Sequence, residues 1–267
     1  MTVGAIDFPA AEERLPIGEG EGATHLAIRL DRPPEPSACV LYAHGFGSSQ
    51  DGEKADFFRR RFVDAGLAFC SFDFRGHGRS GDTMSGLTLS RNLEDMGRVH
   101  DHLRRQGLGP VILMGSSMGG GTALWYAAQG GAKIEAAVHI APGLEMDRGL
   151  LRLLGPGAEE RWRRDGKITF DHELGAYDLS WDLVEDLRRR DAGELRRRYD
   201  TPTLLFQGKR DTSVDWRAVV DFAMDCSRGT VAVHLMADAD HRWLDRMDYL
   251  WESTLSFLRY RGLVGDR

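Results

Sequence analysis

Apolar residues form short, nearly continuous runs through the first half of the chain, and segments with helical spacing separate these runs. The runs cover residues 38–45, 67–74, 110–115 and 134–142, and an alternating run at 24–30 precedes them. Continuous apolar runs of this length are typical of strands that are buried on both faces. Strands that alternate with helices predict an α/β fold with a mostly parallel central sheet and helices on both faces.

The alternation stops between residues 144 and 200. This stretch contains helix-like segments rich in Arg, Asp, Glu and Trp, and it has no strand pattern. Strand-like runs return at residues 201–208 and 230–241, and a final helix is expected over residues 243–260. We therefore predict a single α/β domain over residues 1–267, with a small helical cap insertion at 144–200 that lies over the carboxyl edge of the sheet.

Composition and charge exclude several classes of protein. The 267 residues are 42% hydrophobic and 28% charged, which is ordinary for a soluble globular protein. The net charge of −6 argues against a nucleic-acid partner. The apolar runs are far shorter than the roughly 20 residues that cross a bilayer, so we expect no stable membrane insertion.

Cysteine usage and the N-terminus bear on location. The three cysteines, Cys39, Cys70 and Cys226, form no CxxC pair, and the first two lie in strand-like runs where a buried thiol is expected. The N-terminus lacks a basic start followed by an apolar core, so we expect no signal peptide. These features favour a reducing compartment and predict a cytoplasmic protein.

Three glycine-rich stretches follow predicted strands. They read HGFGSS at residues 44–49, DFRGHGRSG at 73–81 and GSSMGGG at 115–121. Active sites of parallel α/β sheets lie at the carboxyl ends of the strands. We therefore expect the functional site where these three stretches meet.

One serine in the third stretch has the surroundings of a nucleophile. The spacing Gly-x-Ser-x-Gly fits Gly115, Ser117 and Gly119, whereas Ser116 would be flanked by two methionines. A nucleophile at a sharp strand-to-helix turn needs small neighbours two residues before and two after it, because strand and helix approach closely there. Ser117 is the predicted nucleophile, and Ser116 is its neighbour in the turn.

A serine hydroxyl needs a base to take its proton. His44 and His77 lie in glycine-rich loops and could line the site, but both precede the serine. His241 follows the last predicted strand and opens the loop before the last helix. That position agrees with the chain order nucleophile, acid, base that accompanies this kind of serine turn. His241 is the predicted base.

The acid that orients the base should follow a strand between Ser117 and His241. Asp211 lies three residues past Gly208, in the loop after a predicted strand. Asp215 is the alternative, but it lies where the next helix should begin, and an aspartate is favourable there through the helix dipole alone. We favour Asp211.

The developing oxyanion needs two backbone N–H donors. One should belong to the residue after the nucleophile, Met118, which opens a helix. The other should come from the loop after the earlier strand, where Phe46 directly follows the His-Gly pair.

The stretches HGFGSS, FDFRGHGRS, GSSMGG, GKRD and DADHRW occur in the order and spacing of the α/β-hydrolase superfamily. The resemblance covers residues 24–258. Within the superfamily the chain resembles small-cap serine esterases, and it is most similar to the group of acyl-protein thioesterases that are also described as acyl-glucuronide esterases. The resemblance implies that Ser117, Asp211 and His241 form a catalytic triad and that Phe46 and Met118 form the oxyanion hole.

These expectations describe a serine hydrolase that cleaves carboxylic esters or thioesters of small acyl substrates, without a metal or an organic cofactor. An aminopeptidase or amidase on the same scaffold is the first alternative. A non-catalytic binding protein that keeps the fold is the second.

Apolar side chains of the predicted cap have two possible roles, since they could line an acyl pocket or simply pack the cap on the sheet. Short or medium acyl chains are expected, because no long apolar lid is evident. The side chains are Leu150, Leu151, Leu153, Leu154, Trp162, Phe170, Tyr177 and Trp181.

Overall fold

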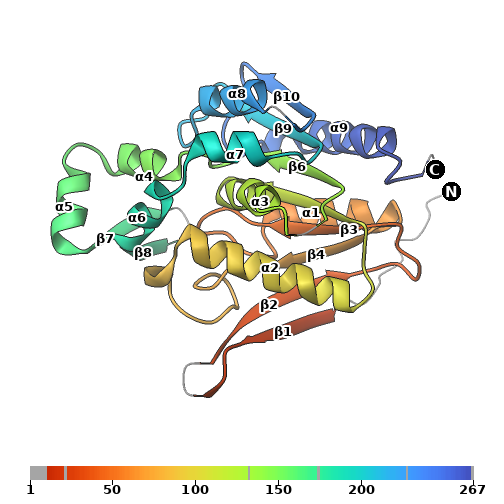
Figure 1. Ribbon diagram of the computed structural model, residues 1–267, viewed down its shortest axis with the longest axis horizontal. Helices are drawn as coiled ribbons and strands as arrows, with labels where there is room; N and C mark the ends of the chain where they lie inside the picture. The colour runs from red at the N-terminus through yellow and green to blue at the C-terminus, as the bar shows by residue number, and fades with distance from the viewer. Residues whose placement is uncertain (1–10, 21–22, 132, 173–174, 227, 266–267) are drawn as a thin grey trace.

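The computed structural model describes residues 11–20, 23–131, 133–172, 175–226 and 228–265 (Figure 1). One sheet of eight strands forms its centre, in the order β1-β2-β4-β3-β5-β6-β9-β10. The strands are β1 (Ala11–Ile17), β2 (Thr24–Asp31), β3 (Cys39–Ala43), β4 (Ala68–Phe72), β5 (Val111–Ser116), β6 (Ala136–Ile140), β9 (Thr203–Gly208) and β10 (Val231–Met236).

The six strands from β4 to β10 in this order are parallel, whereas β1 and β2 are antiparallel to their neighbours. The helices outside the insertion are α1 (Glu53–Asp64), α2 (Leu89–Arg105), α3 (Met118–Ala128), α8 (Trp216–Asp225) and α9 (Met247–Tyr260), with short 3-10 turns η2 (Met84–Gly86) and η3 (Leu244–Arg246). Among the described helices, none has both the length and the apolar character that a membrane crossing requires.

The helices cover both faces of the sheet. The positions of the β3 side chains show why this strand is apolar throughout. Cys39 and Leu41 belong to the core layer beneath α2, α3 and α8, whereas Val40 and Tyr42 belong to the layer beneath α1 and α9. Successive side chains of a strand point to opposite faces, so a strand between two helical layers is apolar at every position. The predicted mostly parallel sheet with helices on both faces is confirmed.

The edge strand β1 was not predicted from the sequence. Its residues Glu12, Glu13 and Arg14 interrupt the apolar pattern, and Glu12 and Arg14 are exposed. Charged side chains are common on edge strands, where they discourage pairing with another chain. β1 lacks an apolar pattern because it lies at the edge of the sheet, and for that reason the pattern did not predict it.

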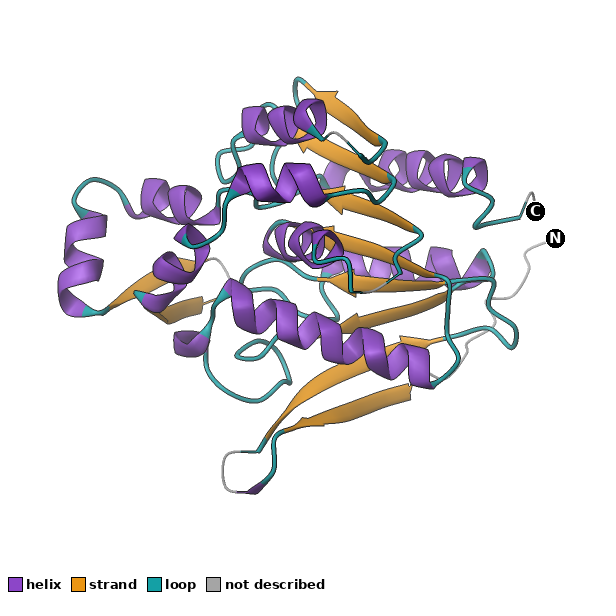
Figure 2. Ribbon diagram, in the orientation of Figure 1, coloured by secondary structure: helices purple, strands orange, loops and turns teal. Residues whose placement is uncertain are grey.

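Between β6 and β9 lies the insertion, residues 144–200, which extends from one end of the sheet (Figure 2). It contains helices α4 (Met146–Leu154), α5 (Ala158–Asp165), α6 (Asp182–Arg188) and α7 (Ala192–Arg198). It also contains an antiparallel hairpin, β7 (Lys167–His172) with β8 (Gly175–Ser180). The insertion therefore has the expected helices, but the prediction that it has no strands is wrong.

The hairpin has a two-residue period that the charged residues around it obscure. Ile168 pairs with Leu179 and Phe170 pairs with Tyr177, and these four side chains are buried or half-buried. Thr169, which lies between Ile168 and Phe170 on β7, is exposed. The alternation is short and covers two brief strands, so the surrounding Arg and Asp residues dominate the composition of the segment.

Helix α3 packs so closely on the sheet that it has no room for a side chain at its second residue. A Cβ atom on Gly119 would lie 2.2 Å from the carbonyl oxygen of Ala43 and 2.5 Å from that of His44. Backbone cannot move aside as a flexible side chain can, so the glycine sets the distance between α3 and β3.

We expect Gly119→Ala to lower the free energy of unfolding by about 1–3 kcal/mol, because the added methyl group overpacks a backbone contact. Gly131→Ala is the control, since a Cβ there would meet nothing within 4 Å, and its effect should stay within about 0.5 kcal/mol. Urea unfolding of the two variants measures the difference. Equal stabilities would contradict the close contact.

Candidate active site

Ser117 lies at the turn between β5 and α3, in a backbone conformation that non-glycine residues rarely adopt. Its φ of 52° and ψ of −120° are sterically unfavourable for a residue with a Cβ atom. Its N–H donates to the carbonyl of Ile140 (2.9 Å), and its own carbonyl accepts from Gly121 (3.0 Å) and Gly143 (2.9 Å). These bonds to neighbouring segments hold the strained turn, and the side chain of Ser117 projects into a cavity.

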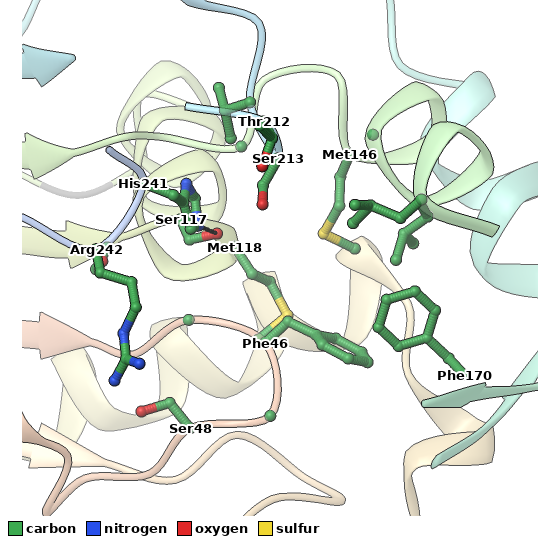
Figure 3. Close-up of a pocket in the computed structure, with 18 of the residues that line it drawn as sticks. Phe46, Ser48, Ser117, Met118, Met146, Phe170, Thr212, Ser213, His241 and Arg242 are labelled. Atoms are coloured by element: carbon green, nitrogen blue, oxygen red, sulfur yellow. Dashed lines mark hydrogen bonds between the residues drawn. The ribbon is translucent and has the colours of Figure 1, made fainter. Parts of the chain in front are cut away.

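The three residues predicted as nucleophile, acid and base are connected by hydrogen bonds. His241 Nε2 lies 3.0 Å from Ser117 Oγ (Figure 3), and His241 Nδ1 lies 2.8 Å from Asp211 Oδ2. The loops after β5, β9 and β10 supply these residues, so the contact depends on the carboxyl ends of three parallel strands.

The Asp211 carboxylate is almost fully enclosed and accepts several hydrogen bonds. Oδ1 accepts from the backbone N–H groups of Ser213 and Val214 (2.8 Å each), and Oδ2 accepts from Gln207 Nε2 (3.1 Å) as well as meeting His241. Burial alone would raise the pKa of the carboxyl, but the His241 side chain and the other donors hold that pKa below its ordinary value. The group is therefore kept ionised.

Asp215, the alternative acid, has a different role in the fold. It is the N-cap of α8, and its carboxylate accepts the backbone N–H of Arg217 (3.0 Å). Ser and Asp side chains at this position satisfy N–H groups that the helix leaves without partners. Of the two aspartates, Asp211 is therefore the one that bonds to His241.

The loop from His44 to Phe46 passes directly over Ser117. A Cβ atom on Gly45 would lie 3.3 Å from Ser117 Cβ, which is closer than ordinary contact. His44 Nδ1 lies 2.7 Å from the Gly45 carbonyl oxygen, and His44 Nε2 lies 3.2 Å from the Phe74 backbone nitrogen. Because the Phe74 N–H must donate, Nε2 accepts, and the ring proton is on Nδ1, where it donates to Gly45.

This hydrogen bond fixes the orientation of one peptide group. The Gly45 carbonyl and the Phe46 N–H belong to the same planar trans peptide, so they point in opposite directions. By binding the carbonyl, the His44 ring determines where the Phe46 N–H points.

The sequence left open whether His44 or His77 lines the site. Within the described part of the chain, neither ring belongs to the cavity wall. Both are buried and pack on each other, with ring centroids 4.9 Å apart. The His44 ring also packs on Phe74, just after β4, and the glycine-rich spacing does not reveal this contact.

A cavity of about 1210 Å³ opens beside Ser117 and has two chemically different sides. Figure 3 shows Phe46, Met118, Met146 and Phe170 on one side of the serine, and Arg242 and Ser48 on the other. The apolar side is completed by the insertion residues Leu150, Leu153, Leu154 and Tyr177.

Both roles considered for the apolar cap residues occur, but in different residues. Leu150, Leu153, Leu154, Phe170 and Tyr177 line the cavity. The other cap residues pack the insertion. Trp162 is fully buried, its indole N–H donates to the Leu179 carbonyl (3.1 Å), and its ring contacts Trp181. Leu151 packs against the main core.

The polar side contains two cationic residues that the sequence analysis missed. Arg242 forms an ion pair with Glu53 (2.9 Å), and Lys54 lines the cavity beside it. Burial, together with the positive charge of Arg242, lowers the pKa of Lys54 to about 8. Arg242 directly follows His241 in the sequence, which was a usable signal. Lys54 belongs to the first turn of α1, and only the fold brings that turn to the site.

Comparisons with known proteins show which proteins the chain is similar to. Residues 34–164, just under half of the chain, match a family model described as serine aminopeptidase, S33. A mitochondrial palmitoyl-protein thioesterase of Bos taurus is 24% identical over 218 residues, which cover 78% of this chain and 68% of the relative. A monoacylglycerol lipase of Mycolicibacterium smegmatis is 32% identical over 142 residues, or 51% of this chain and 49% of the relative.

Among solved structures, alpha/beta hydrolase domain-containing protein 10 from mouse superimposes with a TM-score of 0.75 at 23% identity. The match covers 93% of this chain and 99% of the mouse chain. The fold is therefore the α/β-hydrolase fold, the expected resemblance to acyl-protein thioesterases is confirmed, and the chain is an enzyme of the hydrolase class.

Three buried histidines should make the protein sensitive to acid. Burial lowers the pKa of His44 to about 4 and those of His77 and His139 to about 3, all below the ordinary 6.5. Below pH 6.5 these histidines bind protons in the unfolded chain but stay neutral in the folded protein. The free energy of unfolding therefore falls as the pH drops from 6.5 toward 4. Each histidine contributes up to about 1.4 kcal/mol per pH unit.

The variant His139→Leu separates this effect from other titrations, because His139 lies in β6 with both ring nitrogens unpartnered in the described structure. Its pH dependence of unfolding between pH 6 and 4 should be less steep than that of the wild type by about 1.4 kcal/mol per pH unit. Parallel curves for the two proteins would show that His139 is not held neutral.

Proposed function

We propose that this α/β-hydrolase cleaves carboxylic esters or thioesters of small acyl substrates through a Ser-His-Asp triad and an acyl-enzyme intermediate. The observation that carries the proposal is the continuous hydrogen-bonded chain from Ser117 Oγ through the His241 ring to the Asp211 carboxylate. The Asp211 carboxyl, whose pKa is held below its ordinary value, lies on the Nδ1 side of the ring, where a carboxylate would stabilise the imidazolium.

In the first half of the reaction, Ser117 Oγ attacks the acyl carbon while His241 Nε2 takes its proton. Asp211 holds the ring and stabilises the imidazolium that forms. The backbone N–H groups of Phe46 and Met118 bind the oxyanion of the tetrahedral intermediate. His241 then gives its proton to the leaving alcohol or thiol, the bond to that group breaks, and an acyl ester of Ser117 remains.

In the second half, a water molecule takes the place of the leaving group. His241 removes a proton from the water, the resulting nucleophile attacks the acyl-enzyme, and the same two N–H groups bind the oxyanion. Collapse returns the proton to Ser117 Oγ and releases the carboxylic acid.

The two sides of the cavity suggest how a substrate lies. The apolar side, built largely by the insertion, suits the acyl chain, and the side that contains Ser48, Lys54 and Arg242 suits a polar leaving group. In this proposal the insertion acts as a cap over the site. The relatives named as thioesterase and lipase support ester and thioester chemistry.

We also propose a cytoplasmic location. Cys39 and Cys70 are buried free thiols and Cys226 is a half-buried one, as is common in reducing compartments. The similar bovine thioesterase is named as mitochondrial, so organelle fractionation with an antibody to the chain would decide between the two locations.

An aminopeptidase is the second candidate, because the matching family model carries that description. Initial rates on aminoacyl nitroanilides and on nitrophenyl esters of the same acyl groups separate the two functions. Faster turnover of the amides would favour the peptidase. Absence of turnover on both, with no labelling by a fluorophosphonate probe, would favour a non-catalytic binding protein, since the probe reacts only with an activated serine.

We expect Ser117→Ala to abolish turnover without unfolding the protein, because the side chain provides only the nucleophile. Asp211→Asn should lower kcat on the order of 10²–10⁴-fold, since an amide cannot stabilise the imidazolium. Asp215→Asn is the matched control, because asparagine caps a helix as well as aspartate does. Kinetics on nitrophenyl acetate measure all three. More than a few per cent of activity in Ser117→Ala, or equal losses in the two aspartate variants, would contradict the triad.

Short or medium acyl chains should be the best substrates, because a few side chains of the insertion bound the apolar side. Rates on nitrophenyl esters and acyl-CoA thioesters from C2 to C16 measure the preferred length. Leu153→Trp should shift the optimum to shorter chains, since Leu153 lines the cavity and is exposed enough to accept an indole. Met224→Trp, on an exposed residue outside the cavity wall, is the control. A wild-type optimum at C16 would contradict the expected length.

A further inference from the structure

The ring of Phe46 connects the loop over Ser117 to the insertion. It packs edge-to-face on Phe170, with centroids 5.5 Å apart and the planes at 90°, and on Tyr177, at 5.7 Å and 83°. It also meets the buried ring of His77 at 6.1 Å and 87°. Figure 3 shows the ring of Phe46 beside the ring of Phe170 on the apolar side of the cavity.

Phe170 and Tyr177 form one directly opposed pair across the β7–β8 hairpin. Opposed residues of an antiparallel pair carry their side chains on the same face, so the two rings present a single aromatic surface to Phe46. The next pair on that face is Ile168 with Leu179, and Leu179 is fully buried in the main core. The aromatic surface therefore rests on a hairpin anchored in the protein interior.

The peptide that joins Gly45 to Phe46 is thus held from two directions. On the core side, the His44 ring binds its carbonyl oxygen. On the insertion side, Phe170 and Tyr177 hold the side chain attached to its other end. An N–H donor stabilises an oxyanion only when its direction is fixed before the charge develops, and a displacement of about 1 Å can cost on the order of 10²-fold in rate.

We infer that Phe170 and Tyr177 are positioning residues for the reaction: through the ring of Phe46, the hairpin of the insertion fixes the N–H group that binds the oxyanion. This inference rests on the proposed function. It gives the insertion a part in the chemical step for every substrate, in addition to its contacts with the acyl chain.

Hydrolysis of nitrophenyl acetate distinguishes a residue that positions the N–H donor from a residue that only lines the cavity. Its acyl group is a single methyl, which does not extend along the apolar side. If Phe170 only lined the cavity, its loss would affect long-chain esters and leave the acetate unchanged. If Phe170 positions the donor, Phe170→Leu should lower kcat on the acetate on the order of 3–10-fold, with little change in KM.

Three further variants make the test specific. Tyr177→Leu should lower kcat on the acetate in the same way. Phe170→Tyr keeps the ring and should retain most of the kcat that Phe170→Leu loses. Leu151→Ala removes a half-buried side chain that packs α4 of the insertion on the main core, outside the hairpin and the cavity wall, so it controls for general loosening of the insertion and should leave kcat unchanged. Thermal melting identifies any variant that fails to fold.

A double-mutant cycle tests the route through Phe46. Phe46→Leu keeps the backbone N–H but removes the ring. In that background, Phe170→Leu should cause no further loss of kcat, because the connection is already broken. Independent, multiplicative losses would overturn the inference.

The outcomes also separate this inference from the proposed function. Wild-type turnover of the acetate that disappears in Ser117→Ala establishes the hydrolase reaction by itself. With that in place, unchanged acetate kcat in both Phe170→Leu and Tyr177→Leu would overturn only the positioning role. Absence of Ser117-dependent turnover in the wild type would overturn both.

Discussion

The site depends on a backbone strain at Ser117 that the surrounding segments hold in place. A φ of 52° is costly for a serine, on the order of 1–3 kcal/mol. The Ser117 N–H donates to the Ile140 carbonyl and the Ser117 carbonyl accepts from the Gly143 N–H, which ties the turn to β6 and the loop after it. The close contact of Gly119 with Ala43 ties the turn to β3. Since β3 also leads into the loop with Gly45, the same packing that forces the serine outward brings that loop over it.

Much of this arrangement could be predicted from the sequence, because it follows from local rules and from topology. Buried parallel strands have a plain apolar pattern, and the glycines around Ser117 mark the turn. Once the sheet is parallel, the residues after its strands must gather at one edge, so Ser117, Asp211 and His241 could be selected by their positions after strands. In the structure, His241 is hydrogen-bonded to both Ser117 and Asp211.

What could not be predicted depends on contacts between distant segments. The β7–β8 hairpin is defined by pairing and by the rings that meet Phe46, and its short alternation is concealed by charged neighbours. Lys54 reaches the cavity because α1 begins beside it. His44 belongs to a glycine-rich loop, yet its neighbours turn the ring inward, where it binds the Gly45 carbonyl. In each case the side chain's surroundings come from elements that are remote in the sequence.

Two glycines limit how the enzyme can change. A Cβ atom at Gly119 would lie 2.2 Å from the carbonyl oxygen of Ala43, so a side chain there would require the backbones of α3 and β3 to separate. A Cβ atom at Gly45 would lie 3.3 Å from Ser117 Cβ, so a side chain there would have to displace Ser117. Natural or engineered changes in substrate range are therefore easier in the insertion and on the polar side of the cavity, where side chains can vary in size without moving Ser117.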